Sequence, residues 1–121
     1  MDRTEWVKTL FDSIDRQDND AFQAFLADEI VFRFGNAESV NGKLAAGDLV
    51  KGFLESIKAI SHDVLESWVE GNTVICHGRV TYTRHDSSTL TVPFANILKT
   101  NGRLISEYLI FVDVSELYKT A

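Results

Sequence analysis

The chain has 121 residues with a net charge of -6, and 45% of them are hydrophobic. This length and hydrophobic fraction suit one domain with its own core over residues 1–121, and they exclude a disordered chain. The acidic balance argues against nucleic acid as a partner, because phosphate binding needs a basic face. No apolar run is long enough to cross a bilayer and no signal peptide is visible, so we expect no membrane partner. Cys76 is the one cysteine, which excludes an internal disulfide and favours a cytoplasmic location.

The first half of the chain is predicted to be mainly helical. Apolar residues at helical spacing predict a helix over residues 4–16, and a shorter helix is expected over about residues 20–27. Residues 30–34 have the composition of a strand, and the turn-forming segment GNAESVNG follows them. A third helix is predicted over residues 43–59, where the apolar side chains form one stripe.

The second half is predicted to contain four strands, over residues 62–70, 73–84, 89–100 and 103–113. Short turns at EGNT, HDSS and TNGR would join them into an antiparallel meander. Helices followed by strands predict the α+β class, with three N-terminal helices packed on a curved antiparallel sheet. A hollow between helices and sheet is where a small apolar molecule would bind.

Alternation along the strands sorts the side chains into an inward and an outward set. The inward set is mostly apolar, and we expect it to line the hollow. The outward set includes Arg79 and Glu107, but also Ile97, Leu109 and Phe111. An outer face with exposed apolar residues predicts a homodimer through that face.

The register of the last hairpin decides which residues neighbour Asn96. If Asn101-Gly102 is a two-residue turn, Asn96 lies opposite Glu107. If the loop has three residues and a bulge, Asn96 lies beside Ser106 and Tyr108. We prefer the second arrangement, because an unpaired buried glutamate is costly.

Seven residues are candidates for ligand contact. An asparagine amide can hold a carbonyl group through its N–H, and aromatic residues supply apolar walls and phenol hydroxyls. Alternation places Phe32 and Phe34 on one face and Arg33 on the other. The candidates are Phe32, Phe34, Trp68, Tyr82, Phe94, Asn96 and Tyr108.

His62 is the candidate for acid–base catalysis, because histidine side chains titrate near neutrality. It shares a predicted strand face with Glu66, which would give a base and its partner. His77 is predicted on the outer face. The carboxylates of the first helix and the turn after it are expected to be solvated: Asp12, Asp15 and Asp18.

Neither a metal site nor a cofactor is predicted. Cys76 and His77 are adjacent on one strand and point to opposite faces, so they cannot share a metal ion. No phosphate-binding loop or dinucleotide fingerprint is present. Cys76 is expected to be a small buried residue, because nothing in the sequence activates it as a nucleophile.

The order of helix, short helix, strand, long helix and four-stranded meander resembles the cone-shaped fold of nuclear transport factor 2 and its relatives. Within that superfamily the chain resembles the SnoaL-like polyketide cyclases and the ketosteroid isomerase-related proteins. The likeness implies a small cyclic or carbonyl-bearing ligand, acted on by an isomerase, cyclase or hydrolase with a non-standard site. The alternative is a non-catalytic module that binds a small ligand or dimerises. The segments that carry the resemblance to this superfamily are FRFGNAESVNG, HDVLESWVEGNTV, GRVTYTRHD, VPFAN and GRLISEYLIFVDVSEL.

The catalytic residues of ketosteroid isomerase do not transfer to this chain. The resemblance places the isomerase's base at Phe34, its tyrosine at Leu10 and its protonated acid at Asn96. An amide donates a hydrogen bond but does not move protons at neutral pH, so only ligand contact is expected of Asn96.

Limonene epoxide hydrolase, another relative, uses an Asp-Arg-Asp arrangement that is also incomplete here. Arg79 matches its arginine, but Thr81 and Ile110 stand where the aspartates would be. Neither mechanism is therefore predicted, and acid–base work would fall to His62 or to a carboxylate that the sequence does not identify.

Overall fold

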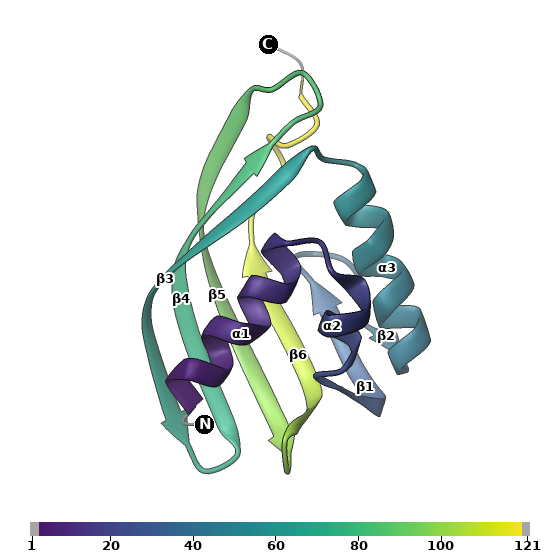
Figure 1. Cartoon of the computed structure of the whole chain (residues 1–121), viewed down its shortest axis with the longest axis vertical. Helices are drawn as coiled ribbons and strands as arrows, with labels where there is room; N and C mark the ends of the chain where they lie inside the picture. The colour runs from purple at the N-terminus through teal and green to yellow at the C-terminus, as the bar shows by residue number, and fades with distance from the viewer. Residues whose placement is uncertain (1–2, 120–121) are drawn as a thin grey trace.

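The computed structural model describes residues 3–119. Helices and strands pack into one α+β unit, which confirms the predicted fold class (Figure 1). The elements are α1 (Arg3–Asp15), α2 (Asn19–Gln23), β1 (Leu26–Phe34), β2 (Val40–Asn41), α3 (Lys43–Glu55), β3 (Ala59–Glu70), β4 (Thr73–Thr83), β5 (Thr89–Asn101) and β6 (Leu104–Val112).

Two element boundaries differ from prediction, and the two-residue strand β2, which pairs with β1, lies in the segment that was predicted to form turns. The chain leaves α2 early, so that β1 begins at Leu26 and not at residue 30. It leaves α3 after Glu55, and β3 already begins at Ala59, inside the predicted helix. In both places tertiary strand pairing extends a strand over residues whose local pattern also suits a helix.

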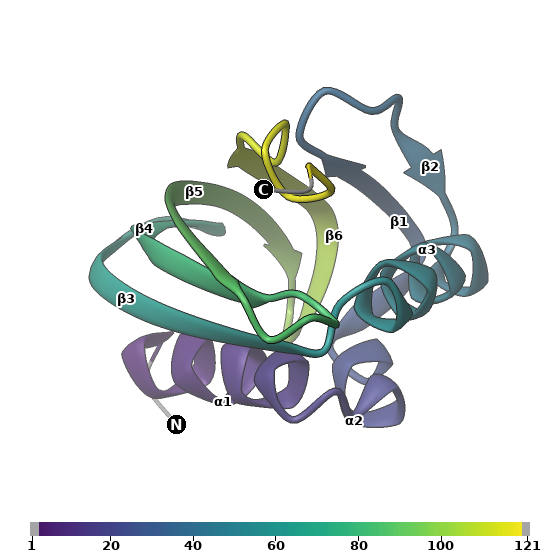
Figure 2. The same cartoon turned by 90° about the horizontal axis from the view of Figure 1, so that it is seen from above.

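One sheet of six strands carries the fold, in the order β2-β1-β6-β5-β4-β3. The predicted meander is present, since β3, β4, β5 and β6 pair antiparallel in sequence order. β1 joins this meander in parallel beside β6. Figure 2 shows the sheet curving around the three helices without closing on itself. No helix among residues 3–119 is long and apolar enough to span a membrane.

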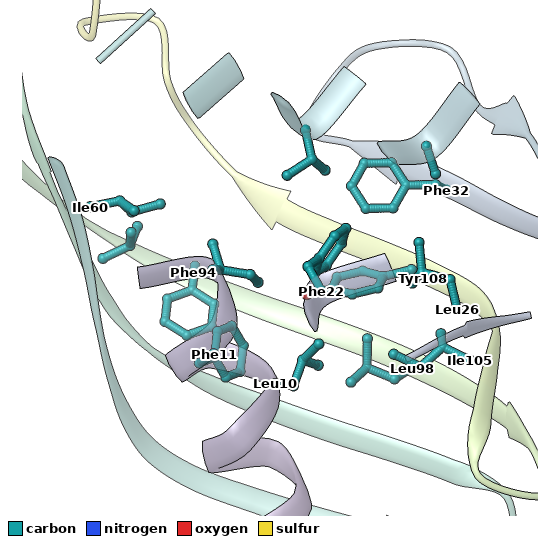
Figure 3. Packing of buried hydrophobic residues seen from close by; sticks show 14 of the residues in the cluster. Leu10, Phe11, Phe22, Leu26, Phe32, Ile60, Phe94, Leu98, Ile105 and Tyr108 are labelled. Atoms are coloured by element: carbon teal, nitrogen blue, oxygen red, sulfur yellow. The ribbon is translucent and has the colours of Figure 1, made fainter. Parts of the chain in front are cut away.

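The core lies between the helices and the inner face of the sheet. Leu10 and Phe11 of α1 are buried there against aromatic residues of the strands, as the helical spacing predicts (Figure 3). In β4 the alternation is regular: Cys76, Val80 and Tyr82 are buried, and the residues between them face outward. The predicted inward set of this strand is therefore confirmed.

A bulge between Val64 and Glu66 interrupts the alternation of β3. At this place the backbone of Asp63 comes so close to Gly78 that a Cβ there would collide with the Asp63 carbonyl oxygen. Glycine at 78 is therefore what allows β3 and β4 to approach. An extra residue also reverses the facing of everything after it, so the predicted facing of β3 fails beyond Val64.

The register of the β5–β6 hairpin matches neither predicted alternative. Asn101 pairs with Leu104 around a two-residue Gly102-Arg103 turn, and a bulge follows between Lys99 and Thr100. Asn96 consequently lies opposite Ile110, and Tyr108 is the neighbouring inward-facing residue of β6. The bulge also turns Ile105 inward, where it is fully buried.

Candidate functional site

A cavity of about 50 Å³ lies between the helices and the inner face of the sheet. Its wall is almost entirely apolar, and strands and helices both contribute to it. Helix residues such as Phe11, Phe22 and Phe53 were not singled out in the sequence, because an apolar helical stripe does not distinguish core from cavity wall. The sequence-predicted candidates that line it are Phe32, Phe34, His62, Tyr82, Phe94, Asn96 and Tyr108. Their contact with a ligand stays a prediction.

The structure corrects the predicted facing of Trp68. This side chain is 49% exposed on the outer face, where its ring stacks on His77 with centroids 5.6 Å apart. Glu66 is on the same face, and its Oε1 lies 3.1 Å from Nε2 of His77. The bulge after Val64 has moved Glu66 and Trp68 outward together, so Glu66 is not the partner of His62.

His62 is paired with Asp15, at the last residue of α1. Nδ1 of His62 lies 2.6 Å from Oδ1 of Asp15, and the backbone N–H of His62 donates to Oδ2 at 3.0 Å. The two side chains are only 11% and 25% exposed. The prediction that Asp15 is solvated is therefore wrong, and no pattern in the sequence links two residues 47 positions apart.

This pairing fixes the proton on the imidazole. Because an ionised carboxylate only accepts hydrogen bonds, Nδ1 of His62 is the donor to Asp15, and whenever the ring is neutral its lone pair is on Nε2. The ring is held between Phe11 and Phe94, with centroid distances of 4.6 and 5.2 Å. An oriented imidazole on an apolar wall is a suitable general base.

The position of Asp15 is electrostatically unfavourable unless the carboxylate has a partner. It ends α1, where the partial negative charge of the helix C-terminus repels a carboxylate, and no basic residue stands in the last turn. The two hydrogen bonds from His62 offset that repulsion. The pair is thus held together at a place where an aspartate alone would be disfavoured.

Asn96 is the buried polar group of the cavity wall, with only 2% of the residue exposed. Its backbone N–H donates to the sulfur of Cys76 on β4. Its side-chain Oδ1 has no hydrogen-bond partner within residues 3–119. A buried carbonyl without a donor is unfavourable, and a bound molecule with a hydroxyl or N–H group would satisfy it.

The other titratable groups near the cavity stay neutral. Burial raises the pKa of the Cys76 thiol to about 11, against a smaller lowering by the Asn96 N–H. Burial also raises the pKa of Tyr82 and of Tyr108, with smaller contributions from nearby Tyr118 and Cys76 respectively. Cys76 is therefore not a nucleophile, and the two phenols serve as hydrogen-bonding hydroxyls.

His62 and Asn96 are not hydrogen-bonded to each other. Phe94 lies between them: its ring contacts His62, and Asn96 is two residues further along the same face of β5. Residues i and i+2 of a strand are about 7 Å apart. A molecule lying over Phe94 would therefore have the imidazole on one side and the amide on the other.

The part of the chain that the structure describes contains no group of three or more His, Cys, Asp or Glu residues suited to a metal ion. His62 and Asp15 form a pair without a third such residue. Their observed arrangement serves to orient an imidazole.

Comparison with known proteins identifies the family and the fold. The sequence model of the SnoaL-like domain matches residues 7–108. A candidate polyketide cyclase from Xanthomonas campestris pv. campestris is 18% identical, with a TM-score of 0.83 over 94% of this chain and 92% of that one. No curated protein sequence matches the chain.

Two further solved structures have the same fold. An LEH-like epoxide hydrolase from M. tuberculosis is 12% identical, with a TM-score of 0.80 over 94% of this chain and 84% of that one. A ketosteroid isomerase-like protein from Catenulispora acidiphila, in complex with trimethylamine, is 14% identical, with a TM-score of 0.84 over 92% and 87%. Identities this low establish a shared fold, and the chemistry has to come from the residues of the cavity itself.

Proposed function

Because the chain belongs to the SnoaL-like domain family, we propose that it is a small acid–base enzyme acting on a carbonyl-bearing or cyclic molecule bound in the cavity. The observation that carries the proposal is the His62–Asp15 pair on an otherwise apolar wall. An imidazole whose Nδ1 is held by a carboxylate presents Nε2 as a base.

In the proposed reaction, Nε2 of His62 removes a proton from the carbon next to the carbonyl group. The negative charge moves to the carbonyl oxygen, and the proton later returns from the imidazolium to the same or another carbon. Asp15 positions the ring and stabilises its protonated form. The step needs no cofactor, and it suits isomerisation and ring closure alike.

Asn96 holds the oxygen of the bound molecule in this proposal. An asparagine amide can donate through its NH₂ group to a ketone or accept through Oδ1 from an enol hydroxyl. The unpartnered Oδ1 therefore suits the enol form of the bound molecule, and the NH₂ group suits the keto form. The hydroxyl of Tyr108, one inward position away, is a second donor for the developing negative charge.

The test is hydrogen–deuterium exchange at the α-carbon of cyclohexanone, followed by NMR in D₂O. We expect the protein to accelerate exchange, and His62→Gln to abolish the acceleration because glutamine is not a base. Asp15→Asn is expected to reduce it, and Asn96→Leu to weaken binding of the ketone. Acceleration that survives in His62→Gln would overturn the proposal.

A non-catalytic binding module is the second candidate, favoured by the absence of a hydrogen bond between His62 and Asn96. In that case the cavity holds a small molecule and the imidazole contributes only to its wall. Saturable binding of cyclohexanone without accelerated exchange would select this function over the enzyme.

A further inference from the structure

The hollow between helices and sheet is filled mainly by the aromatic rings that line it. The ring of Tyr108 lies 5.1 Å from that of Phe32 and 6.1 Å from that of Phe22 (Figure 3). What remains is a cavity of about 50 Å³. An apolar cavity that accepts benzene measures about 150 Å³, and one water molecule takes about 30 Å³ in the liquid. The cavity is therefore smaller than one that holds a benzene ring, so a single ring can enter only if the lining side chains move, and a larger molecule would require larger movements.

Phe53 closes the outer side of this cavity. It projects from α3, and its ring lies 4.8 Å from Phe34 of β1 and 5.7 Å from Tyr82 of β4. Contacts with two strands that are not neighbours in the sheet make Phe53 a bridge across the hollow. Phe34 and Phe53 are partly exposed, whereas Phe22 and Phe32 are fully buried. Phe53 therefore belongs to the outermost layer of rings.

The polar part of the cavity wall adds a chemical limit to the size limit. Oδ1 of Asn96 is buried and has no donor from residues 3–119. Apart from the imidazole of His62 and the hydroxyls of Tyr82 and Tyr108, the surrounding wall is apolar. An apolar ring whose one hydrogen-bonding group reaches Asn96 matches this wall, and a heavily oxygenated molecule would bury polar groups without partners.

We propose that the ligand of this cavity is a monocyclic molecule with one hydroxyl or ketone oxygen, and that Phe53 is the residue that sets this size limit. The inference rests on the proposed function only in taking the same cavity as the binding site. On this proposal steroid-sized and polyketide-sized molecules do not fit, because Phe22, Phe32 and Phe53, which line the cavity, would have to move to admit them.

The experiment compares three probes by NMR titration: phenol, toluene and 2-naphthol. Phenol and toluene have nearly the same shape, so their difference reports the hydrogen bond to Asn96. We expect phenol to bind about tenfold more tightly than toluene. The second ring of 2-naphthol exceeds the space available, so its binding to the unchanged protein is expected to be at least tenfold weaker than that of phenol.

Phe53→Ala removes the bridging ring and is expected to reverse the size preference, with 2-naphthol gaining at least tenfold in affinity. Phe111→Ala is the matched control, since Phe111 is 51% exposed on the outer face and does not line this cavity. It should leave all three affinities unchanged. Phe53→Leu keeps an apolar side chain of intermediate size, so it tests the same limit if the alanine variant does not fold.

Equal binding of phenol and 2-naphthol to the unchanged protein would overturn the size limit, as would binding of neither. A gain of 2-naphthol in Phe111→Ala as large as in Phe53→Ala would overturn the role of Phe53. These outcomes are separable from the proposed catalysis, because the exchange assay with His62→Gln can fail while the size preference holds. Conversely, exchange that depends on His62 together with equal binding of both probes would reject only the size limit.

Discussion

His62 gives both its imidazole Nδ1 and its backbone N–H to one carboxylate, that of Asp15, at 2.6 and 3.0 Å. The pair ties the end of α1 to β3 and orients the ring on the cavity wall. Stability and the proposed acid–base chemistry therefore depend on the same two residues.

Asp15→Asn should destabilise the fold by about 1–3 kcal/mol, because a charge-assisted hydrogen bond to a mostly buried imidazole is lost. Urea unfolding measures the change. Asp12→Asn is the control: Asp12 pairs with Arg16 on the exposed side of the same helix. It should cost at most about 0.5 kcal/mol. Equal effects of the two substitutions would contradict a special role for Asp15.

Stability should fall as pH rises from about 9 to 11, and Cys76 should contribute to the fall. The unfolded thiol ionises near its ordinary pKa of 9.0, whereas burial raises the pKa of the folded thiol to about 11. The unfolded state then binds fewer protons, so the free energy of unfolding decreases with pH in this window. Buried Tyr82 and Tyr108 act in the same direction at higher pH.

Comparison with Cys76→Ala isolates the contribution of the thiol. Between pH 9 and pH 11, the free energy of unfolding should fall less in the variant than in the unchanged protein, with a difference of at most about 2–3 kcal/mol. Urea titrations at each pH measure this difference. A thiol reagent at pH 8 should modify Cys76 in the unchanged protein only after urea is added. Rapid modification of the folded protein would show that the thiol is accessible.

Gly78→Ala should destabilise the protein by at least about 2 kcal/mol, because its Cβ would collide with the backbone oxygen of Asp63 at the β3 bulge. Gly52→Ala makes the same change in α3, where no atom lies within 4 Å of the added carbon. It should stabilise the protein by about 1 kcal/mol through helix propensity. Thermal unfolding of both variants checks the opposite signs.

Homodimerisation through the outer sheet face remains a prediction. Phe111 is 51% exposed there, and Trp68 and Ile75 are 49% and 38% exposed on the same face. If a second copy covers this face, Phe111→Lys should convert the dimer to a monomer in sedimentation velocity. Leu44→Lys, at a position 78% exposed on α3, should leave the sedimentation coefficient unchanged. A monomeric parent protein would reject the interface.

Local patterns in the sequence predict the three helices, the five longer strands, the apolar face of α1 and the inward set of β4, because each depends on a repeat of 3.6 or 2 residues. The two-residue strand β2 has no such repeat and was not predicted. The same repeats placed six of the seven predicted ligand-contact residues, and His62, on the cavity wall. They failed for Trp68, because one extra residue after Val64 reverses the facing of the rest of β3.

The partner of His62 and the size of the cavity depend on tertiary packing. The pairing of His62 with Asp15 depends on how α1 packs against β3, a contact between segments that share no sequence pattern. The size of the cavity depends on how phenylalanine and tyrosine rings from seven elements fit together, which no single segment encodes. Local periodicity therefore supplied the cavity wall, including His62, and packing supplied the pairing with Asp15 and the space left between the rings.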